Sequence, residues 1–267
     1  ANNIVLVESG KQYKVLTLTD CFEYDEQTYN YYGSYSFTGT KIEQAVVTAI
    51  LNVTTDDKVV VDMIKGNNEQ DYSSLKTLLE NNAYQVNEVS LATGDFDSNA
   101  KIAIMYAPSV DLDEKIVEKL STWLSNDGKY GRSLIYVPTA DMGEMPNLDD
   151  FLKEWGMSID RGYVFETDES TLVSASSPYA FTVSYGDYYK DNLKNSKIPV
   201  VVSESHAVNI TDENTAHALL KTSDKAGVLP IDADKNWDYK DAVSGNGENV
   251  AAEGVMTNED KNSSRVI

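Results

Sequence analysis

The sequence predicts an α/β protein with a doubly wound parallel sheet, preceded by an N-terminal β-hairpin and a helix. Two observations lead to this prediction. From residue 57 onward, short apolar segments alternate with amphipathic segments, which is the order of strands and helices in a parallel sheet. The first apolar segment, 58–64, has the continuous character of a strand that is buried on both faces.

The N-terminal segment has its own pattern. Apolar stretches at 4–7 and 13–18 flank Gly10 and predict the hairpin, and the polar, tyrosine-rich segment 20–39 predicts a loop. Thr40 and Glu43 have the spacing of a capping box, so a helix is expected to begin there. Its apolar stripe is expected to face a core and consists of Ile42, Ala45, Val46, Ala49, Ile50 and Val53.

The remaining elements follow from the same patterns. Helices are expected over about 71–82, from a cap at 111–114 to Gly128, and around 148–155. Further strands are expected at 84–90, 102–107, 133–137, 181–185, 199–203 and 216–221, with a long polar loop or insertion at 223–250. We expect residues 1–55 to pack on an α/β core of residues 56–267, the whole forming one structural domain.

Composition excludes several classes of protein. The formal net charge of −21 disfavours binding to nucleic acid and to anionic membranes. The hydrophobic fraction of 41% argues against a disordered chain. Cys21 is the only cysteine, so no intramolecular disulfide is expected, and no apolar run has the length of about 18 residues that a membrane span needs.

The loops that follow the predicted strands are the expected place for ligand contacts, because open α/β sheets bind ligands at the carboxyl ends of their strands. The loop after 58–64 has one glycine, Gly66, and therefore lacks the dinucleotide-binding fingerprint. No cofactor is expected. The candidate ligand-binding residues are Asn67, Asn68, Glu69, Pro108, Ser109, Thr139 and Asp141.

The sequence supports catalysis less strongly than ligand binding. Ser109 follows a predicted strand, where a nucleophile would lie, but His206 and His217 occur late in the chain and no GxSxG pattern is present. No catalytic residue is therefore assigned. An alternative is a hydrolase or carbohydrate-active enzyme in which Glu69 and Asp141 serve as acid and base.

The segment 232–238 has oxygen ligands at alternating positions, as calcium loops do: Asp232, Asp234, Asn236 and Asp238. Trp237 and Val243 occupy the positions of the glycine and the bidentate glutamate of an EF-hand, which excludes that motif. A looser calcium site and a solvated acidic loop stay open. Tyrosines cluster at 29–35 and 185–189, so a calcium-dependent sugar-binding or adhesion module is a second alternative.

Several segments together resemble the GldG-like family, the auxiliary extracytoplasmic domains of ABC-type transport systems. Where that family has a Gly-His-Gly-Glu loop after its first core strand, this chain has Gly66, Asn67, Asn68 and Glu69. The other matching segments are 41–54, Tyr106-Ala107-Pro108 followed by Leu112 and Glu114, and Asn147-Leu148 through Trp155-Gly156. The resemblance extends over nearly the whole chain.

This resemblance implies a flavodoxin-like or amidotransferase-like fold without enzymatic activity. It also implies a place on the extracytoplasmic face of the cell membrane, with anchoring segments that this chain does not contain, and an ABC permease and ATPase as partners. Because Asn67 replaces the family's histidine, chemistry that depends on that imidazole is not expected here. Neither the ligand nor self-association into a homo-oligomer follows from the sequence.

Overall fold

The computed structural model describes residues 4–190, 193–195, 197–234, 236–243 and 245–267. The chain forms two compact units. The smaller unit contains the chain up to Val61 together with Asp71–Asn87, and the larger unit contains Asp62–Gln70 and Glu88–Ile267. The segment 71–87 therefore groups with the N-terminal residues, whereas the sequence analysis placed the boundary between 55 and 56.

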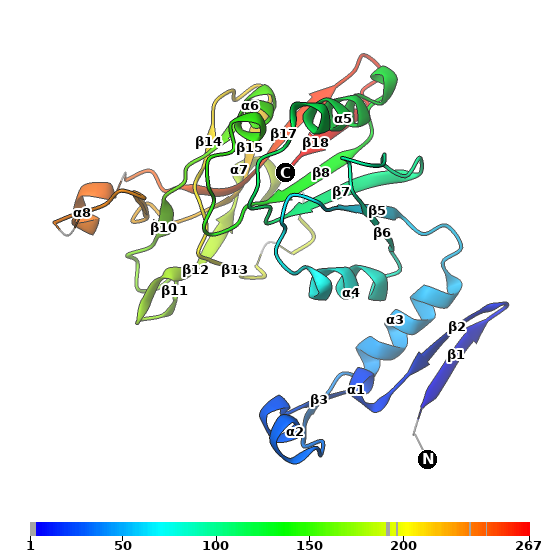
Figure 1. Cartoon of the computed structure of the whole chain (residues 1–267). Helices are drawn as coiled ribbons and strands as arrows, with labels where there is room; N and C mark the ends of the chain where they lie inside the picture. The colour runs from blue at the N-terminus through cyan, green and yellow to red at the C-terminus, as the bar shows by residue number, and fades with distance from the viewer. Residues whose placement is uncertain (1–3, 191–192, 196, 235, 244) are drawn as a thin grey trace. The chain divides into compact units, whose positions relative to one another are not determined.

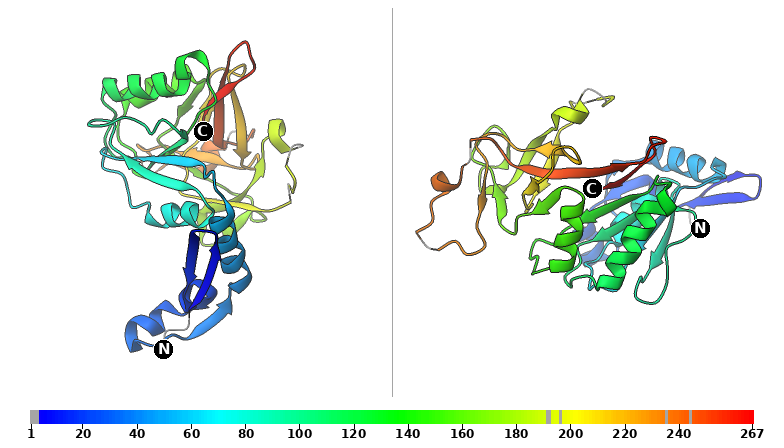
Figure 2. Two further views of the ribbon diagram at one scale, coloured as in Figure 1. Left: turned by 90° about the vertical axis from the view of Figure 1, so that its right-hand side faces the viewer. Right: turned by 90° about the horizontal axis from the view of Figure 1, so that it is seen from above.

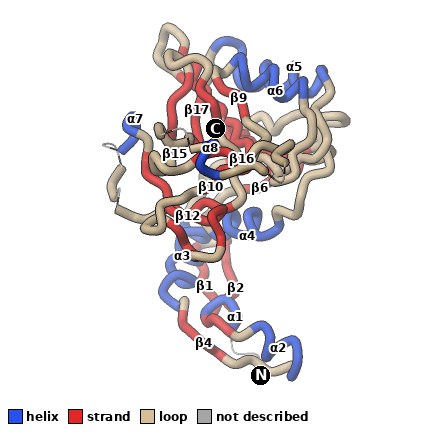
Figure 3. The backbone as a smooth tube through the Cα atoms, turned by 90° about the vertical axis from the view of Figure 1, so that its left-hand side faces the viewer, coloured by secondary structure: helices blue, strands red, loops and turns tan. Residues whose placement is uncertain are grey.

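The smaller unit contains the predicted hairpin and helix. Strands β1 (Val5–Ser9) and β2 (Gln12–Leu16) pair antiparallel, and helix α3 (Ile42–Thr54) lies against them (Figure 3). Gly10, at a φ of 61°, makes the turn. The buried core between hairpin and helix consists of Leu16, Cys21 and Ala49, with Val7, Phe22, Ala45 and Val46 packed against it.

The prediction of a loop over 20–39 is wrong. This segment forms β3 (Phe22–Tyr24), α2 (Glu26–Tyr32) and β4 (Phe37–Thr40), after a short helix α1 (Leu18–Cys21). Strands β3 and β4 pair antiparallel. The polar residues are helix caps, because the Asp25 carboxylate accepts hydrogen bonds from the amides of Gln27 and Thr28 at the start of α2.

The predicted capping box of α3 is also absent. Lys41 occupies the N-cap position without a side-chain cap, and Thr40 Oγ1 lies 3.5 Å from the amide nitrogen of Ile42. The reason is that Thr40 is the last residue of β4 and pairs with Phe22. The helix consequently turns only part of the predicted stripe inward: Ala49 and Val53 are buried, whereas Ile42 and Ile50 are exposed. Helix α4 (Ser73–Asn81) completes this unit.

The larger unit is built on a sheet in the order β11-β12-β15-β17-β18-β8-β7-β5-β6 (Figure 1). Strands β7 (Ala100–Tyr106), β8 (Ser133–Val137) and β18 (Ser263–Val266) run parallel. Strands β5 (Val60–Ile64) and β6 (Gln85–Val89) contribute residues to both units, and all of β5 is buried, as predicted. The predicted fold class, α/β with a largely parallel central sheet and an N-terminal hairpin, is confirmed.

Antiparallel strands extend this sheet beyond β18, so that it is mixed. They are β17 (Asn249–Thr257), β15 (Ala216–Lys221), β12 (Ser177–Tyr185) and β11 (Leu172–Ser174), and β13 (Val200–Ser203) also pairs with β12. The strands predicted at 181–185, 199–203 and 216–221 thus exist. The segment 223–250 is not entirely loop, because it contains β16 (Gly227–Leu229) and α8 (Tyr239–Ala242).

Smaller antiparallel pairs and two short helical segments complete the unit. Strand β10 (Tyr163–Phe165) pairs with β16, and β14 (Val208–Ile210) pairs with β9 (Met157–Ile159). The short segments are α7 (Asp187–Lys190) and the 3₁₀ turn η1 (Asn126–Gly128).

Two helices lie side by side over the parallel part of the sheet when it is seen from above (Figure 2). They are α5 (Glu114–Ser125) and α6 (Pro146–Glu154). Asp113 caps α5, and the neighbouring Asp111 accepts hydrogen bonds from the amides of Asn147 and Leu148 at the start of α6. The acidic segment predicted to cap one helix therefore caps both. None of the helices among the described residues is long and apolar enough to cross a membrane.

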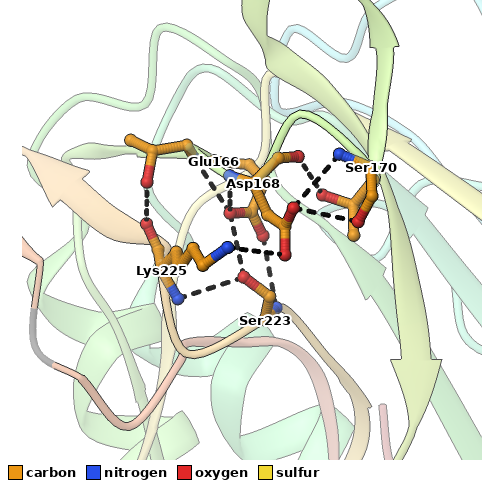
Figure 4. A network of polar contacts seen from close by, with 7 residues as sticks. Glu166, Asp168, Ser170, Ser223 and Lys225 are labelled. Atoms are coloured by element: carbon orange, nitrogen blue, oxygen red, sulfur yellow. Dashed lines mark hydrogen bonds and ion pairs between the residues drawn. The ribbon is translucent and has the colours of Figure 1, made fainter.

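A buried carboxylate joins two distant loops of the larger unit (Figure 4). Glu166 is 1% exposed, and its Oε1 accepts hydrogen bonds from the amides of Thr167 and Asp168, both at 2.8 Å. Ser223 donates to the same carboxylate through its hydroxyl at 2.9 Å and through its amide at 3.2 Å. Outside this centre, Lys225 Nζ lies 3.2 Å from Asp168 Oδ2. The carboxylate thus ties the end of β10 to the segment before β16.

We expect Glu166→Ala to lower the free energy of unfolding by about 2–4 kcal/mol, because it leaves several buried donors without an acceptor. Urea unfolding followed by tryptophan fluorescence would measure this loss. The matched control is Glu169→Ala, since Glu169 is exposed in the same loop and its replacement should leave stability unchanged. Equal effects of the two substitutions would show that the Glu166 network does not hold the loops together.

Glu253 on β17 gives a prediction about pH. Its side chain is 6% exposed, and burial raises the pKa of this carboxyl although Arg265, 3.4 Å away, acts in the opposite direction. A raised pKa in the folded state means that stability is lost as the pH rises through that pKa. Glu253→Gln should therefore be more stable than the wild type at about pH 7, with the difference vanishing below about pH 4.

Thermal unfolding of both proteins across this pH range measures the difference, with Glu259→Gln in the exposed turn between β17 and β18 as the control. A variant less stable than the wild type at neutral pH would show that the ion pair with Arg265 outweighs the desolvation of the carboxylate.

Candidate functional site

Three loops meet at the carboxyl ends of β5, β7 and β8, within the larger unit. The carbonyl oxygen of Asn67 accepts hydrogen bonds from the amides of Ser109 and Val110, both at 3.1 Å. The Asn68 side chain donates to the Ser109 hydroxyl, which donates to the Asn68 carbonyl oxygen at 3.0 Å. The third loop is joined by Gln70, whose Nε2 donates to the Thr139 hydroxyl at 2.8 Å. We call these loops, 66–70, 107–110 and 139–141, the carboxyl edge.

The backbone of the carboxyl edge adopts uncommon conformations. Gly66, Asn68 and Ala107 have φ angles of 118°, 56° and 48°. Glycine and asparagine tolerate this left-handed region, but an alanine there costs free energy. Ala107 is held by hydrogen bonds on both sides, from its amide to the Val137 carbonyl at 2.7 Å and from the Gln70 amide to its own carbonyl at 3.1 Å. Strain of this kind is concentrated at functional sites.

The two carboxylates named in the hydrolase alternative have other partners. Both oxygens of Glu69 accept hydrogen bonds from its own loop, from the amides of Gly66 and Asn67 at 2.9 Å. Asp141 is exposed and accepts a hydrogen bond from the Tyr163 hydroxyl at 3.1 Å. Partial burial and this bond raise the pKa of Tyr163. No hydrogen bond among the described residues joins Glu69 to Asp141.

His206 is a site residue whose role the sequence did not indicate. The ring is 4% exposed, with Nδ1 2.9 Å from the Gly162 carbonyl oxygen and Nε2 3.0 Å from the Thr139 carbonyl oxygen. It therefore links the carboxyl edge to the loop before β10. Its partners lie 44 and 67 residues away in the chain, and no local sequence pattern reports contacts of that range.

Among the described residues, no hydrogen bond joins Ser109, the candidate nucleophile, to either histidine. Ser109 exchanges its hydrogen bonds with Asn68, and the ring nitrogens of His206 both face carbonyl oxygens. The second histidine, His217, stacks on Tyr188 with ring centroids 4.1 Å apart. A serine nucleophile requires a base within hydrogen-bonding reach, and neither histidine meets that condition for Ser109.

An apolar cavity of about 360 Å³ lies beside the carboxyl edge, and we call it the aliphatic cavity. Pro138 and His206 both line this cavity. Each is also next to the carboxyl edge, because Pro138 precedes Thr139 in the chain and His206 Nε2 lies 3.0 Å from the Thr139 carbonyl oxygen. The sequence analysis missed the cavity because its walls come from segments spread over residues 135–267. The apolar lining residues are Ile135, Tyr136, Val137, Pro138, Leu152, Met157, Ile159, Val202, Val208, Val250, Ala251, Ala252 and Ile267.

Two carboxylates of the candidate calcium segment accept hydrogen bonds from backbone amides two residues further along the chain. Asp234 accepts a hydrogen bond from the amide of Asn236 at 2.7 Å, and Asp238 accepts one from the amide of Lys240 at 3.1 Å. Asp232 is exposed, and Lys235 lies outside the described residues. Among the residues that are described, no three His, Cys, Asp or Glu side chains are grouped as metal ligands.

Three tyrosines of the smaller unit, Tyr24, Tyr29 and Tyr35, form an aromatic cluster. The rings of Tyr29 and Tyr35 stack with centroids 4.5 Å apart, and Tyr24 meets both of them edge-on. Tyr35 also stacks on Phe37. These rings pack against one another, whereas Tyr31 is 82% exposed. The cluster therefore packs β3, α2 and β4 together, while Tyr29, Tyr35 and Phe37 stay 37%, 44% and 45% exposed.

The fold and the site define the larger unit as an α/β domain with a largely parallel sheet and a hydrogen-bonded carboxyl edge. The "mmIFT52 N-terminal domain" has a similar structure, with a TM-score of 0.55 and 13% sequence identity over 78% of this chain and 85% of that chain. At that identity the likeness shows the fold alone. The "Structure of PurLQS from Thermotoga maritima" aligns with a TM-score of 0.33 and 9% identity over the same shares. No protein-family model matches the chain, and no curated protein matches it.

The contacts of Ser109 give a test of the carboxyl edge. Ser109→Ala removes the hydroxyl that holds the Asn68 loop, at a cost of about 1 kcal/mol, so the amides of Ser109 and Val110 should exchange hydrogen roughly fivefold faster. Hydrogen exchange measured on peptides that cover 107–112 would detect this. Ser176→Ala, in the exposed turn between β11 and β12, is the control and should leave these amides unchanged. Unchanged exchange in Ser109→Ala would contradict a role for the hydroxyl in ordering the edge.

Proposed function

We propose that this chain is a non-catalytic accessory domain that binds a partner protein through its carboxyl edge. The observation that supports this is the bonding of the edge itself. The side chains of Asn68, Gln70 and Ser109 hold the three loops to one another. The strained Ala107 is held by backbone hydrogen bonds to Val137 and Gln70. A preorganised polar surface of this kind loses little conformational entropy when a partner docks on it.

Exposed groups make the carboxyl edge accessible to a partner. Val110 is 55% exposed beside Asn68 and Ser109, which are also exposed. An apolar side chain among polar ones is the composition expected of a small protein-binding surface. Pro108 and Thr139 are buried beneath them and support the loops rather than contact a partner.

The resemblance to the GldG-like family supports a more specific proposal. In this proposal the domain works on the extracytoplasmic face of the membrane, beside the permease and ATPase of an ABC-type transport system. The loop that carries the family's histidine contains Asn67 here, and its side chain donates to Glu69 within the loop. This loop therefore has an ordering role in the proposal, and the domain acts by binding.

The test is co-purification of this chain with the permease and ATPase subunits of an ABC-type transport system that are expressed together with it. We expect Val110→Arg to lower recovery of the subunits about tenfold, because it places a long charged side chain on the edge, while the melting temperature stays unchanged. Val173→Arg is a matched control, since Val173 is 57% exposed on β11. The proposal fails if the wild type does not retain the subunits, or if both variants reduce recovery equally.

A further inference from the structure

The aliphatic cavity lies between the edges of two strands of the larger unit. Strand β18 pairs with β8 on one side and with β17 on the other, and its Val266 lies opposite both Leu134 and Gly254. Past these partners β8 continues for three residues and β17 for five, whereas β18 is followed by Ile267 alone. Beyond Ile267, the described part of the sheet has no strand between β8 and β17.

Backbone groups of β8 face this gap. The Ile267 amide donates to the Leu134 carbonyl oxygen at 2.9 Å, and the Tyr136 amide donates to the Ile267 carbonyl oxygen at 2.8 Å. Since the N–H and C=O groups of one strand residue point to the same side, the Tyr136 carbonyl also faces the side of β18. It lies one step past Ile267, at the position that the amide of an added strand would reach.

Backbone groups of β17 face the gap from the opposite side. The Val255 amide donates to the Thr215 carbonyl oxygen at 2.8 Å, on the side of β15. Successive residues of a strand direct their N–H and C=O groups to opposite neighbours, so Ala252 and Val250 direct theirs away from β15 and into the gap. Two strand edges that face each other in this way complement an extended backbone placed between them.

The side chains around the gap determine which segment fits. Ser264 Oγ donates to the Leu124 carbonyl oxygen of α5, so Ser264 and Val266 face the helices. By the alternation of a strand, the first and third residues of an added segment would face that side too, where Leu152 of α6 lines the cavity. The described lining residues include the acidic Glu204 and no lysine or arginine. Apolar residues at alternate positions therefore fit, and an acidic residue does not.

We propose that the aliphatic cavity binds an extended segment of a partner protein, which adds a strand in line with β18. The segment runs parallel to β8 and antiparallel to β17, as β18 does. A strand with this direction leaves the cavity beside Thr139, on the carboxyl edge. The inference rests on the proposed function for its partner, because the segment then belongs to the protein that docks on this edge, and it adds strand addition as the mode of recognition.

The experiment measures the binding of a synthetic peptide to the purified 267-residue chain. The probe is acetyl-Val-Thr-Val-Thr-Lys-Lys-Lys-amide with fluorescein on its last lysine, followed by fluorescence anisotropy. N-methylation of its second residue, opposite the Tyr136 carbonyl, should weaken binding about tenfold, because it removes a backbone hydrogen bond and places a methyl group in the ladder. The control peptide is N-methylated at the second lysine, outside the ladder. It has the same charge and should bind as the probe does.

Two measurements locate the bound peptide. Hydrogen exchange of the backbone amides should slow in fragments that cover 249–253 and stay unchanged in fragments that cover 172–174 of β11. Val137→Trp, in the cavity wall, should abolish binding, whereas Val201→Trp, at a position that is 56% exposed on β13, should not. If Val137→Trp does not fold, the comparison of the N-methylated peptides still decides.

An extension of the chain distinguishes a partner strand from a strand attached to this chain. Val-Thr-Val-Thr added after Ile267 should fill the cavity, raise the melting temperature and abolish binding of the probe. The proposal is overturned if the extension raises the melting temperature but the probe does not bind the wild type, since the cavity then accepts only an attached strand. It is also overturned if both N-methylated peptides bind as the probe does.

The peptide assay contains no transport subunits, so its failure leaves the proposed partner surface untouched. Failure of the co-purification together with normal binding of the probe would contradict the transport partner alone.

Discussion

The larger unit depends on one constraint, which is that the buried polar groups of its loops need hydrogen-bond partners. The sheet supplies these for its strands, but the loops receive many of theirs from single side chains. His206 lies between two carbonyl oxygens, Glu166 accepts four hydrogen bonds from two loops, and Asp111 accepts amides at the start of α6. Each contact joins segments that are distant in sequence, so these few residues determine how the loops lie on the sheet.

The same constraint accounts for the bonding of the carboxyl edge. Ser109, Asn68 and Glu69 are residue types that catalytic sites also use, but here their polar atoms are engaged in holding loops. Val110, between these loops and solvent, is left 55% exposed.

The sequence predicted the parallel core well and the N-terminal segment less well. Strands β7 and β8 and helix α5 have strong local patterns, and each was predicted within a few residues. The segment 20–39 was misread because its polar residues are caps and its tyrosines pack on one another, which resembles loop composition. Thr40 does not cap α3 because its backbone pairs with Phe22 of β3, a tertiary effect that no local motif shows.

For the candidate site, the sequence by itself predicted a set of residues. The rule that ligands contact the carboxyl ends of parallel strands named Asn67, Asn68, Ser109 and Thr139, and the structure places them in one hydrogen-bonded group. It also determined the alternation of strands and helices, since periodicity is a local property. Only the tertiary structure decided what these residues do, because their partners are remote. The bridge made by His206 and the antiparallel extension through β17 each require segments from across the chain to meet.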